Sequence, residues 1–93
     1  MAVWRCAFDP ARDAVNQAKH GASLALAEIL FAAPYAPMED DRFEGHEARA
    51  IAFGHIADRL FACVYLRRGG ERRILSLRKA NQREVARYGH DFE

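Results

Sequence analysis

The spacing of apolar residues predicts helices in the first third of the chain and mostly strands after it. A short apolar run from Val3 to Phe8 predicts an initial strand. Asp9 and Pro10 then predict the start of a helix, because Asp can cap free amide groups and Pro fits the first helical turn. This helix is expected to end at Gly21, which readily adopts the left-handed conformation that terminates many helices.

A second helix is predicted from Leu24 to about Ala32, with Ser23 as its cap. Its buried face is expected to carry four apolar residues at helical spacing: Leu24, Ala27, Leu30 and Phe31. Pro34 and Pro37 are expected to end this helix, because proline has no amide hydrogen to donate.

Beyond Pro37 the apolar period changes to two, which indicates strands. Strands are predicted over residues 39–44, 49–54, 58–67 and 73–78, and the Arg-Gly-Gly-Glu sequence at 68–71 predicts a hairpin turn. The strand at 58–67 is the most apolar. One of its faces is expected to carry Leu60, Ala62, Val64 and Leu66, and the other Phe61, Cys63 and Tyr65.

The last strand is expected to place Ile74, Ser76 and Arg78 on one face, and Arg73, Leu75 and Leu77 on the other. A closing helix is predicted to start at Asn81, because Glu84 three residues later completes a capping box. Val85 and Tyr88 are expected to face inward, and the helix to end near Gly89. These elements predict one domain over residues 1–93, of the α+β class, with an antiparallel sheet of three to five strands and helices packed on one face.

Length and composition exclude several classes of protein. A chain of 93 residues is too short for a two-domain enzyme, and 51% hydrophobic residues argue against disorder. The longest uncharged run, residues 29–38, is too short to cross a bilayer, and no secretory signal is evident, so a cytoplasmic protein is expected. Cys6 and Cys63 lie in apolar segments without zinc spacing, which favours reduced core thiols and no metal or other cofactor.

The net charge of +1 hides an uneven distribution of charges. Residues 1–66 hold six Lys/Arg against nine Asp/Glu, whereas residues 67–93 hold eight Lys/Arg against four Asp/Glu. Such a basic segment in a small domain favours a surface that faces a polyanion, although a merely solvated charged face explains it about as well.

A set of short motifs runs through nearly the whole chain in a fixed order. It comprises Phe8-Asp9-Pro10, Asn16, Lys19-His20-Gly21, Glu47-Ala48-Arg49, Arg73-Ile74-Leu75-Ser76, Arg78-Lys79-Ala80, Arg83-Glu84 and Tyr88. On these residues the chain resembles the BrnT family of type II toxin-antitoxin toxins. The family usually has an acidic residue where this chain has Leu26, and His46 separates Gly45 from Glu47, a departure that changes the local charge.

The resemblance implies a RelE-like ribonuclease fold, metal-independent cleavage of RNA, and arrest of translation and growth when the antitoxin is lost. It also implies a BrnA-like ribbon-helix-helix antitoxin as partner, binding of operator DNA only through that partner, and a heterotetramer with two copies of each component. Two other classes of function stay open. One is a non-catalytic antitoxin-binding module, such as a decayed toxin acting in operator repression. The other is a DNA-binding domain, which is weaker because no helix carries a helix-turn-helix pattern.

RNA cleavage without metal needs a base for the 2′-hydroxyl proton, cations for the phosphorane and an acid for the leaving 5′-oxygen. Arg78 is the first choice for the phosphate, because its planar fork can donate to two oxygens; a salt bridge to an acidic neighbour is the alternative. Lys79 is expected either to contact phosphate or to lie in solvent.

His20 is the candidate acid or base, because histidine titrates near neutral pH. A Lys19-His20 pair before a glycine is equally typical of a helix end stabilised by cations. Glu47 could act as the base or hold Arg49, which would share its face in a strand; surface pairing is the alternative.

Three more residues are predicted to contact RNA. Arg59 and Arg67 flank the central strand, where strand ends often border a site, and Tyr65 could stack on a base if it is not part of the core. The other histidines, His46, His55 and His90, are expected on the surface or in loops, with no metal-ligand spacing among them.

Overall fold

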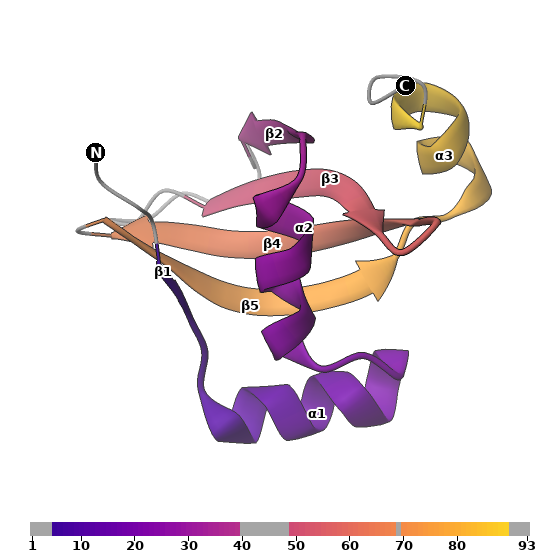
Figure 1. Cartoon of the computed structure of the whole chain (residues 1–93). Coiled ribbons are helices and arrows are strands. Elements are labelled where there is room, and N and C mark those ends of the chain that lie inside the picture. The colour runs from indigo at the N-terminus through magenta and orange to yellow at the C-terminus, as the bar shows by residue number, and fades with distance from the viewer. Residues whose placement is uncertain (1–4, 40–48, 69, 90–93) are drawn as a thin grey trace.

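The computed structural model describes residues 5–39, 49–68 and 70–89. The elements follow in the order β1 (Arg5–Ala7), α1 (Pro10–His20), a 3-10 turn η1 (Leu24–Leu26), α2 (Ala27–Ala32), β2 (Tyr35–Glu39), β3 (Arg49–Ile56), β4 (Arg59–Arg68), β5 (Glu71–Lys79) and α3 (Gln82–Tyr88). The five strands form one sheet in the order β1-β5-β4-β3-β2, and Figure 1 shows α2 lying across it. Strands β2 to β5 are antiparallel, whereas β1 pairs with β5 in parallel. The α+β class is therefore confirmed.

Helix α1 begins and ends where its sequence predicts. The Asp9 carboxylate accepts a hydrogen bond from the amide of Ala11 at 2.8 Å, and Pro10 occupies the first turn. Gly21 ends the helix with φ 70°, in the left-handed region, and donates its amide hydrogen to the carbonyl of Gln17. The next helix differs from the prediction, since residues 24–26 form a 3-10 turn capped by Ser23 before α2 begins at Ala27.

Asn16 fastens α1 to the sheet. Its side-chain amide nitrogen donates to the carbonyl oxygens of Ala22 and Leu77, both at 2.8 Å, and its oxygen accepts from the amide of Leu77 at 3.1 Å. The residue is 4% exposed, and its three hydrogen bonds satisfy polar groups that burial would otherwise leave unpaired. These hydrogen bonds to Leu77 of β5 and to Ala22 therefore position the end of α1.

The main core lies between η1, α2 and the first face of the sheet. Its fully buried side chains include Leu24, Leu30, Cys63, Ile74 and Leu77. The Phe31 ring makes edge contacts with the rings of Tyr35 and Tyr65, with centroids 4.9 and 5.0 Å apart. The Arg72 guanidinium lies 4.2 Å from the centre of the Phe31 ring, so this arginine is part of the packing between β5 and α2.

A smaller core lies on the second face of the sheet, under α3. It consists of Phe53, Leu60, Ala62 and Ala80, against which Ile51 and Tyr88 pack. Tyr88 of α3 stacks on Phe53 with ring centroids 4.3 Å apart, which confirms that Tyr88 faces inward. The expectation that all helices pack on one face is wrong for α3, which packs on the second face, whereas α2 packs on the first. Val85 is 40% exposed, so the prediction that it faces inward is wrong.

The predicted faces of β4 are consistent with its pairing, but the predicted faces of β5 are wrong. The pairing of β4 with β5 shifts between Val64 and Tyr65, so that Leu75 is an extra residue in β5. An extra residue reverses the alternation of the strand. Ile74 and Leu77 therefore share the first face with the main core, whereas Arg78 points to the second face.

Strand β2 covers residues 35–39, whereas the edge strand was predicted over 39–44; residues 40–44 lie outside the described part of the chain. Pro37, expected to end the helix, lies within this strand, where proline is tolerated because the strand is at the edge of the sheet.

Candidate functional site: a cationic corner of the sheet

Arg78 is held in place by Glu84. Its two terminal nitrogens donate to the two carboxylate oxygens of Glu84 at 2.7 and 2.8 Å, a bidentate pair between the end of β5 and the first turn of α3. Glu84 is itself fixed by the capping box: its carboxylate accepts from the amide of Asn81, and the Asn81 side chain accepts from the amide of Glu84. The guanidinium plane of Arg78 is thus oriented by a helix cap.

This pairing keeps both groups charged. The hydrogen bonds to Glu84 raise the pKa of Arg78 above its ordinary value, despite partial burial. The hydrogen bonds from Arg78 likewise hold the pKa of Glu84 below its ordinary value. The Arg78 side chain is 36% exposed, so its remaining N–H groups can reach a ligand in solution. The salt bridge expected as an alternative to phosphate binding is therefore present, and it leaves donors available.

Several other predicted site residues lie around the end of β5. Lys79 follows Arg78 and points to the first face, because it pairs with Phe61 of the main core. Arg59 begins β4 at this end of the sheet, next to Leu60, whose carbonyl accepts from the amide of Ala80.

Lys19 and His20 lie at the same end of the molecule. They lie between Asn16 and Ala22 in the sequence. The Asn16 side chain donates to the carbonyl of Ala22 and to that of Leu77, which is two residues before Lys79. Figure 1 shows the end of α1 and the end of β5 on the same side of the molecule. We call the set Lys19, His20, Arg59, Arg78 and Lys79 the cationic corner.

The predicted residues do not form a single pocket. Arg78 points to the second face, where it meets Glu84 of α3, whereas His20 ends α1, which Asn16 joins to the outer edge of β5 at Leu77. Arg49 and Arg67 lie at the other end of the strands. Arg67 is eight residues from Arg59 along β4, or roughly 26 Å at the rise of a strand. Glu47 lies outside the described residues.

Tyr65 is placed in the core. It is 2% exposed and packs under Phe31, and burial raises the pKa of its hydroxyl. A ring in this position has no face available to an RNA base, so the structure contradicts the prediction that Tyr65 stacks on RNA and supports the alternative that it belongs to the core.

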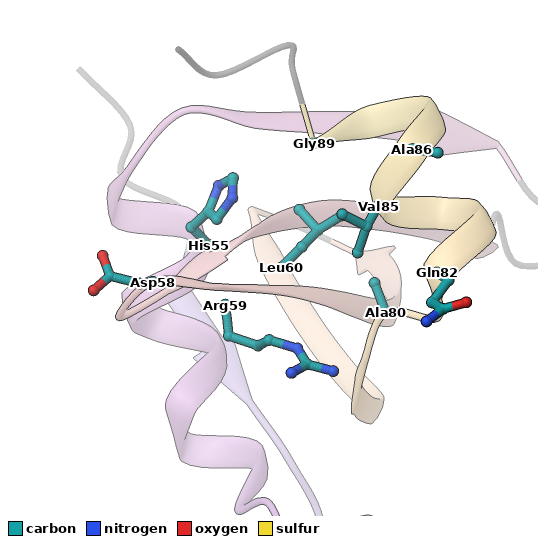
Figure 2. Close-up of a pocket in the computed structure, with 9 residues that line it drawn as sticks. All are labelled: His55, Asp58, Arg59, Leu60, Ala80, Gln82, Val85, Ala86 and Gly89. Atoms are coloured by element: carbon teal, nitrogen blue, oxygen red, sulfur yellow. The ribbon is translucent and has the colours of Figure 1, made fainter.

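The structure adds a cavity beside α3 that sequence reasoning missed. It has a volume of about 640 Å³ and lies between the β3–β4 turn and α3, with His55 and Arg59 in its lining. Figure 2 shows His55, Leu60 and Arg59 on the hairpin side of this cavity and Val85, Ala86 and Gln82 on the helix side. The period-two alternation of β3 extends to His55, which shares a face with Phe53, and this was the signal available in the sequence.

Within residues 5–39, 49–68 and 70–89, no group of three His, Cys, Asp or Glu side chains is arranged to hold a metal ion. In the same part of the chain, no helix is long and apolar enough to cross a membrane. Cys6 and Cys63 are both free thiols, and burial raises the pKa of each.

The structure is that of a small α+β domain in which one group of cations lies at one end of the sheet, beside an arginine that is held by a carboxylate. The sequence model of BrnT, the ribonuclease toxin of type II toxin-antitoxin systems, matches residues 8–84. This match spans most of the chain, so the protein belongs to the BrnT family of ribonuclease toxins. No curated protein matches the chain. As toxins of type II toxin-antitoxin systems, the proteins of this family have an antitoxin partner.

Proposed function

We propose that this protein is an endoribonuclease toxin that cleaves RNA without a metal ion at the cationic corner and thereby inhibits translation and growth. The observation that carries the proposal is the family match over residues 8–84, which includes every residue of the corner. The bidentate Arg78–Glu84 pair adds a chemical reason, since an oriented, permanently charged guanidinium is suited to the two oxygens of a phosphate.

In the proposed reaction, the 2′-hydroxyl oxygen of one nucleotide attacks the adjacent phosphorus and loses its proton to a base. The bond from phosphorus to the 5′-oxygen breaks, and that oxygen receives a proton from an acid. The products are a 2′,3′-cyclic phosphate and a 5′-hydroxyl end. Arg78 is assigned to the negative charge that develops on the phosphorane, and Lys79 and Arg59 to the neighbouring phosphates.

His20 is the proposed proton-transfer group. It is partly exposed at the end of α1, which Asn16 joins to the edge of β5 two residues before Lys79. Arg78 and Lys79 are consecutive residues that point to opposite faces at the end of β5, so an RNA backbone that passes around this end meets both of them. Lys19, next to His20, is assigned to a phosphate of the same RNA backbone. Glu47 stays a prediction for the base.

The test is cleavage of single-stranded RNA by the purified chain in the presence of EDTA. Wild-type protein is expected to cut the RNA and leave 2′,3′-cyclic phosphate ends, and a 2′-deoxy substitution at the cut nucleotide is expected to block the cut. Arg78→Ala is expected to lose at least about 100-fold of the rate, in the range found when a transition-state donor is removed. Arg12→Ala, which removes an exposed arginine on α1, serves as the matched control.

Growth of a bacterial host provides the second readout. Induction of the wild-type chain alone is expected to arrest growth and shorten RNA, and Arg78→Ala is expected to allow growth. Normal growth with abundant, folded wild-type protein, together with intact RNA in the purified assay, would refute the enzyme proposal and favour the non-catalytic binding module.

We also propose a BrnA-like ribbon-helix-helix antitoxin as the partner, in a heterotetramer that binds operator DNA through the antitoxin. Support comes from the family, since a type II toxin is neutralised by a protein. A counter-charged antitoxin segment is expected to cover the cationic corner. Co-purification with the product of a neighbouring small reading frame, followed by light scattering, tests both partner and stoichiometry; recovery of the chain alone would contradict the assignment.

A further inference from the structure

The cavity lies on the second face of the sheet, as the Arg78–Glu84 pair does, but on a different side of α3. Along α3, Gln82, Val85, Ala86 and Gly89 line the cavity, as expected for positions at helical spacing on one side of a helix. Glu84 and Tyr88 occupy another side of α3 and pack on the sheet. Helix α3 therefore has a side committed to the sheet and a side that forms a wall of the cavity.

The lining of the cavity is partly apolar and partly polar. Leu60 and Ala80 at its base are 3% exposed each and belong to the small core, so the floor is rigid and apolar. Val85 and Ala86 continue this apolar surface on α3. His55, Asp58, Arg59 and Gln82 supply the polar groups of the lining. An apolar slot with a few polar groups, at about 640 Å³, is typical of sites for small organic ligands.

The polar groups match a nucleotide. Arg59 is part of the cavity lining, and its side chain extends from the start of β4 on the side of the hairpin opposite Leu60, with its guanidinium below Ala80 in the view of Figure 2. Histidine is among the side chains on which unpaired RNA bases stack, and the amide of glutamine can bond to the edge of a base. Because Arg59 belongs to both the corner and the cavity lining, the cavity opens next to the proposed RNA path.

We propose that this cavity binds one unpaired nucleotide of the RNA substrate, with its base against Leu60 and Val85 beside His55 and its phosphate at Arg59. This inference rests on the proposed function, because it names a subsite of the same substrate. The base in the cavity fixes which phosphate reaches Arg78, so the subsite determines where the RNA is cut. His55, expected from the sequence to be an ordinary surface residue, is thereby given a positioning role.

The first test uses 5′-mononucleotides as probes of the wild-type protein by amide NMR. Adding a 5′-mononucleotide is expected to shift the signals of residues 55–60 and 82–89, whereas ribose 5-phosphate is expected to shift only those near Arg59. Equal shifts with both compounds, or none with either, would overturn the proposal, because no base would then be bound.

The second test fills the cavity. Ala86→Trp places an indole in the slot from an exposed helix position, and Ala14→Trp on α1 is the matched control, since Ala14 is also exposed and lies outside the cavity and the corner. Ala86→Trp is expected to weaken mononucleotide binding at least about 5-fold, the lower end of what one stacked base contributes. It is also expected to change the cut positions on a long RNA, and Ala14→Trp to leave both unchanged.

The outcomes separate this inference from the function on which it rests. If wild-type protein cleaves RNA and Ala86→Trp cuts at the same positions and rates, the nucleotide site is wrong and the ribonuclease proposal stands. If wild-type protein does not cleave RNA, the ribonuclease proposal fails, and the mononucleotide titration alone decides whether the cavity binds a base. His55→Ala is expected to reduce mononucleotide binding in parallel, while circular dichroism confirms that the variant is folded.

Discussion

Glu84 combines two tasks that are usually divided between residues. Its carboxylate completes the cap of α3 through the Asn81 amide, and the same carboxylate holds both terminal nitrogens of Arg78. The start of the helix and the orientation of the proposed phosphate-binding cation therefore depend on one side chain. Substitutions of Arg78 and of Glu84 should therefore separate the effect of this pair on RNA cleavage from its effect on stability.

Arg78→Lys tests whether the shape of the cation matters in addition to its charge. Lysine carries the same charge but cannot hold two Glu84 oxygens and still present a planar set of donors. The rate of RNA cleavage is expected to fall about 100-fold or more, with a change in Tm of only a few degrees. Parallel measurement of cleavage rate and thermal unfolding checks this, with Arg12→Lys as the control. A rate within a few-fold of wild type would show that charge alone suffices.

The lowered pKa of Glu84 predicts how stability depends on pH. A carboxyl group with a lower pKa in the folded state stabilises the fold above its unfolded pKa of about 4.5, and this contribution is lost as the pH falls through the folded value. The free-energy difference between wild type and Glu84→Gln is therefore expected to be constant above about pH 5.5 and to shrink below 4.5. At neutral pH we expect about 1–2 kcal/mol.

Urea unfolding at pH 7, 5, 4 and 3 measures this difference. Glu28→Gln, at an exposed carboxylate on α2, is the control and is expected to change the unfolding free energy by less than about 0.5 kcal/mol at pH 7. A Glu84→Gln difference that grows toward low pH would reverse the sign and disprove the assignment.

At the scale of elements, α2 lies unusually close to β3 at Gly54. A Cβ atom on Gly54 would lie 2.9 and 3.0 Å from two side-chain carbons of Leu30 and 3.2 Å from the Cβ of Tyr35. Leu30 is fully buried, so it has little room to move aside. The absence of a side chain at residue 54 thus sets the distance between the helix and the sheet.

Gly54→Ala is expected to lower the free energy of unfolding by about 1–3 kcal/mol, the usual cost of overpacking. Leu30→Ala alone is expected to cost about 2–5 kcal/mol. The double variant should lose less than the sum of the two, because the truncated leucine makes room for the new methyl group. Denaturant unfolding of all four proteins measures the coupling, and strict additivity would show that the two residues do not interfere.

The ends of α1 and α3 were predictable because their signals are local. Asp9, Gly21 and the Asn81–Glu84 box act on backbone groups within a few residues of themselves. The faces of β5 were not, because the extra residue at Leu75 is a property of its pairing with β4. The location of α3 on the second face could not be predicted either, because it depends on the contact between Tyr88 and Phe53, which are far apart in the sequence.

At the scale of the whole molecule, the basic segment of the sequence separates into two groups. Arg78 and Lys79 lie at the cationic corner, whereas Arg72 packs on Phe31 far along the same strand. The sequence alone could not show this division, because a count of charges does not say at which end of the sheet each basic residue lies. A single pocket for all predicted residues was therefore too simple an expectation, and only an RNA several nucleotides long reaches both ends of the sheet.

The salt dependence of RNA binding tests this division. If the four permanent cations of the corner each neutralise a phosphate, the logarithm of the affinity should fall with the logarithm of salt concentration at a slope of about −3. Arg59→Ala is expected to reduce the slope by about 0.7, and Arg12→Ala to leave it unchanged. Filter binding of a short single-stranded RNA between 50 and 300 mM salt gives the slopes, and a shallower slope for Arg12→Ala would place the contacts elsewhere.

The bonds from Asn16 to Leu77 also bear on self-association. β1 pairs only with Glu71–Arg73, so further along β5 the outer backbone groups would otherwise be available to a strand from another molecule. Asn16 occupies the amide and carbonyl of Leu77 there, and at the opposite border of the sheet Pro37 has no N–H to donate. Each border of the sheet thus carries a feature that opposes pairing with a strand of a second molecule.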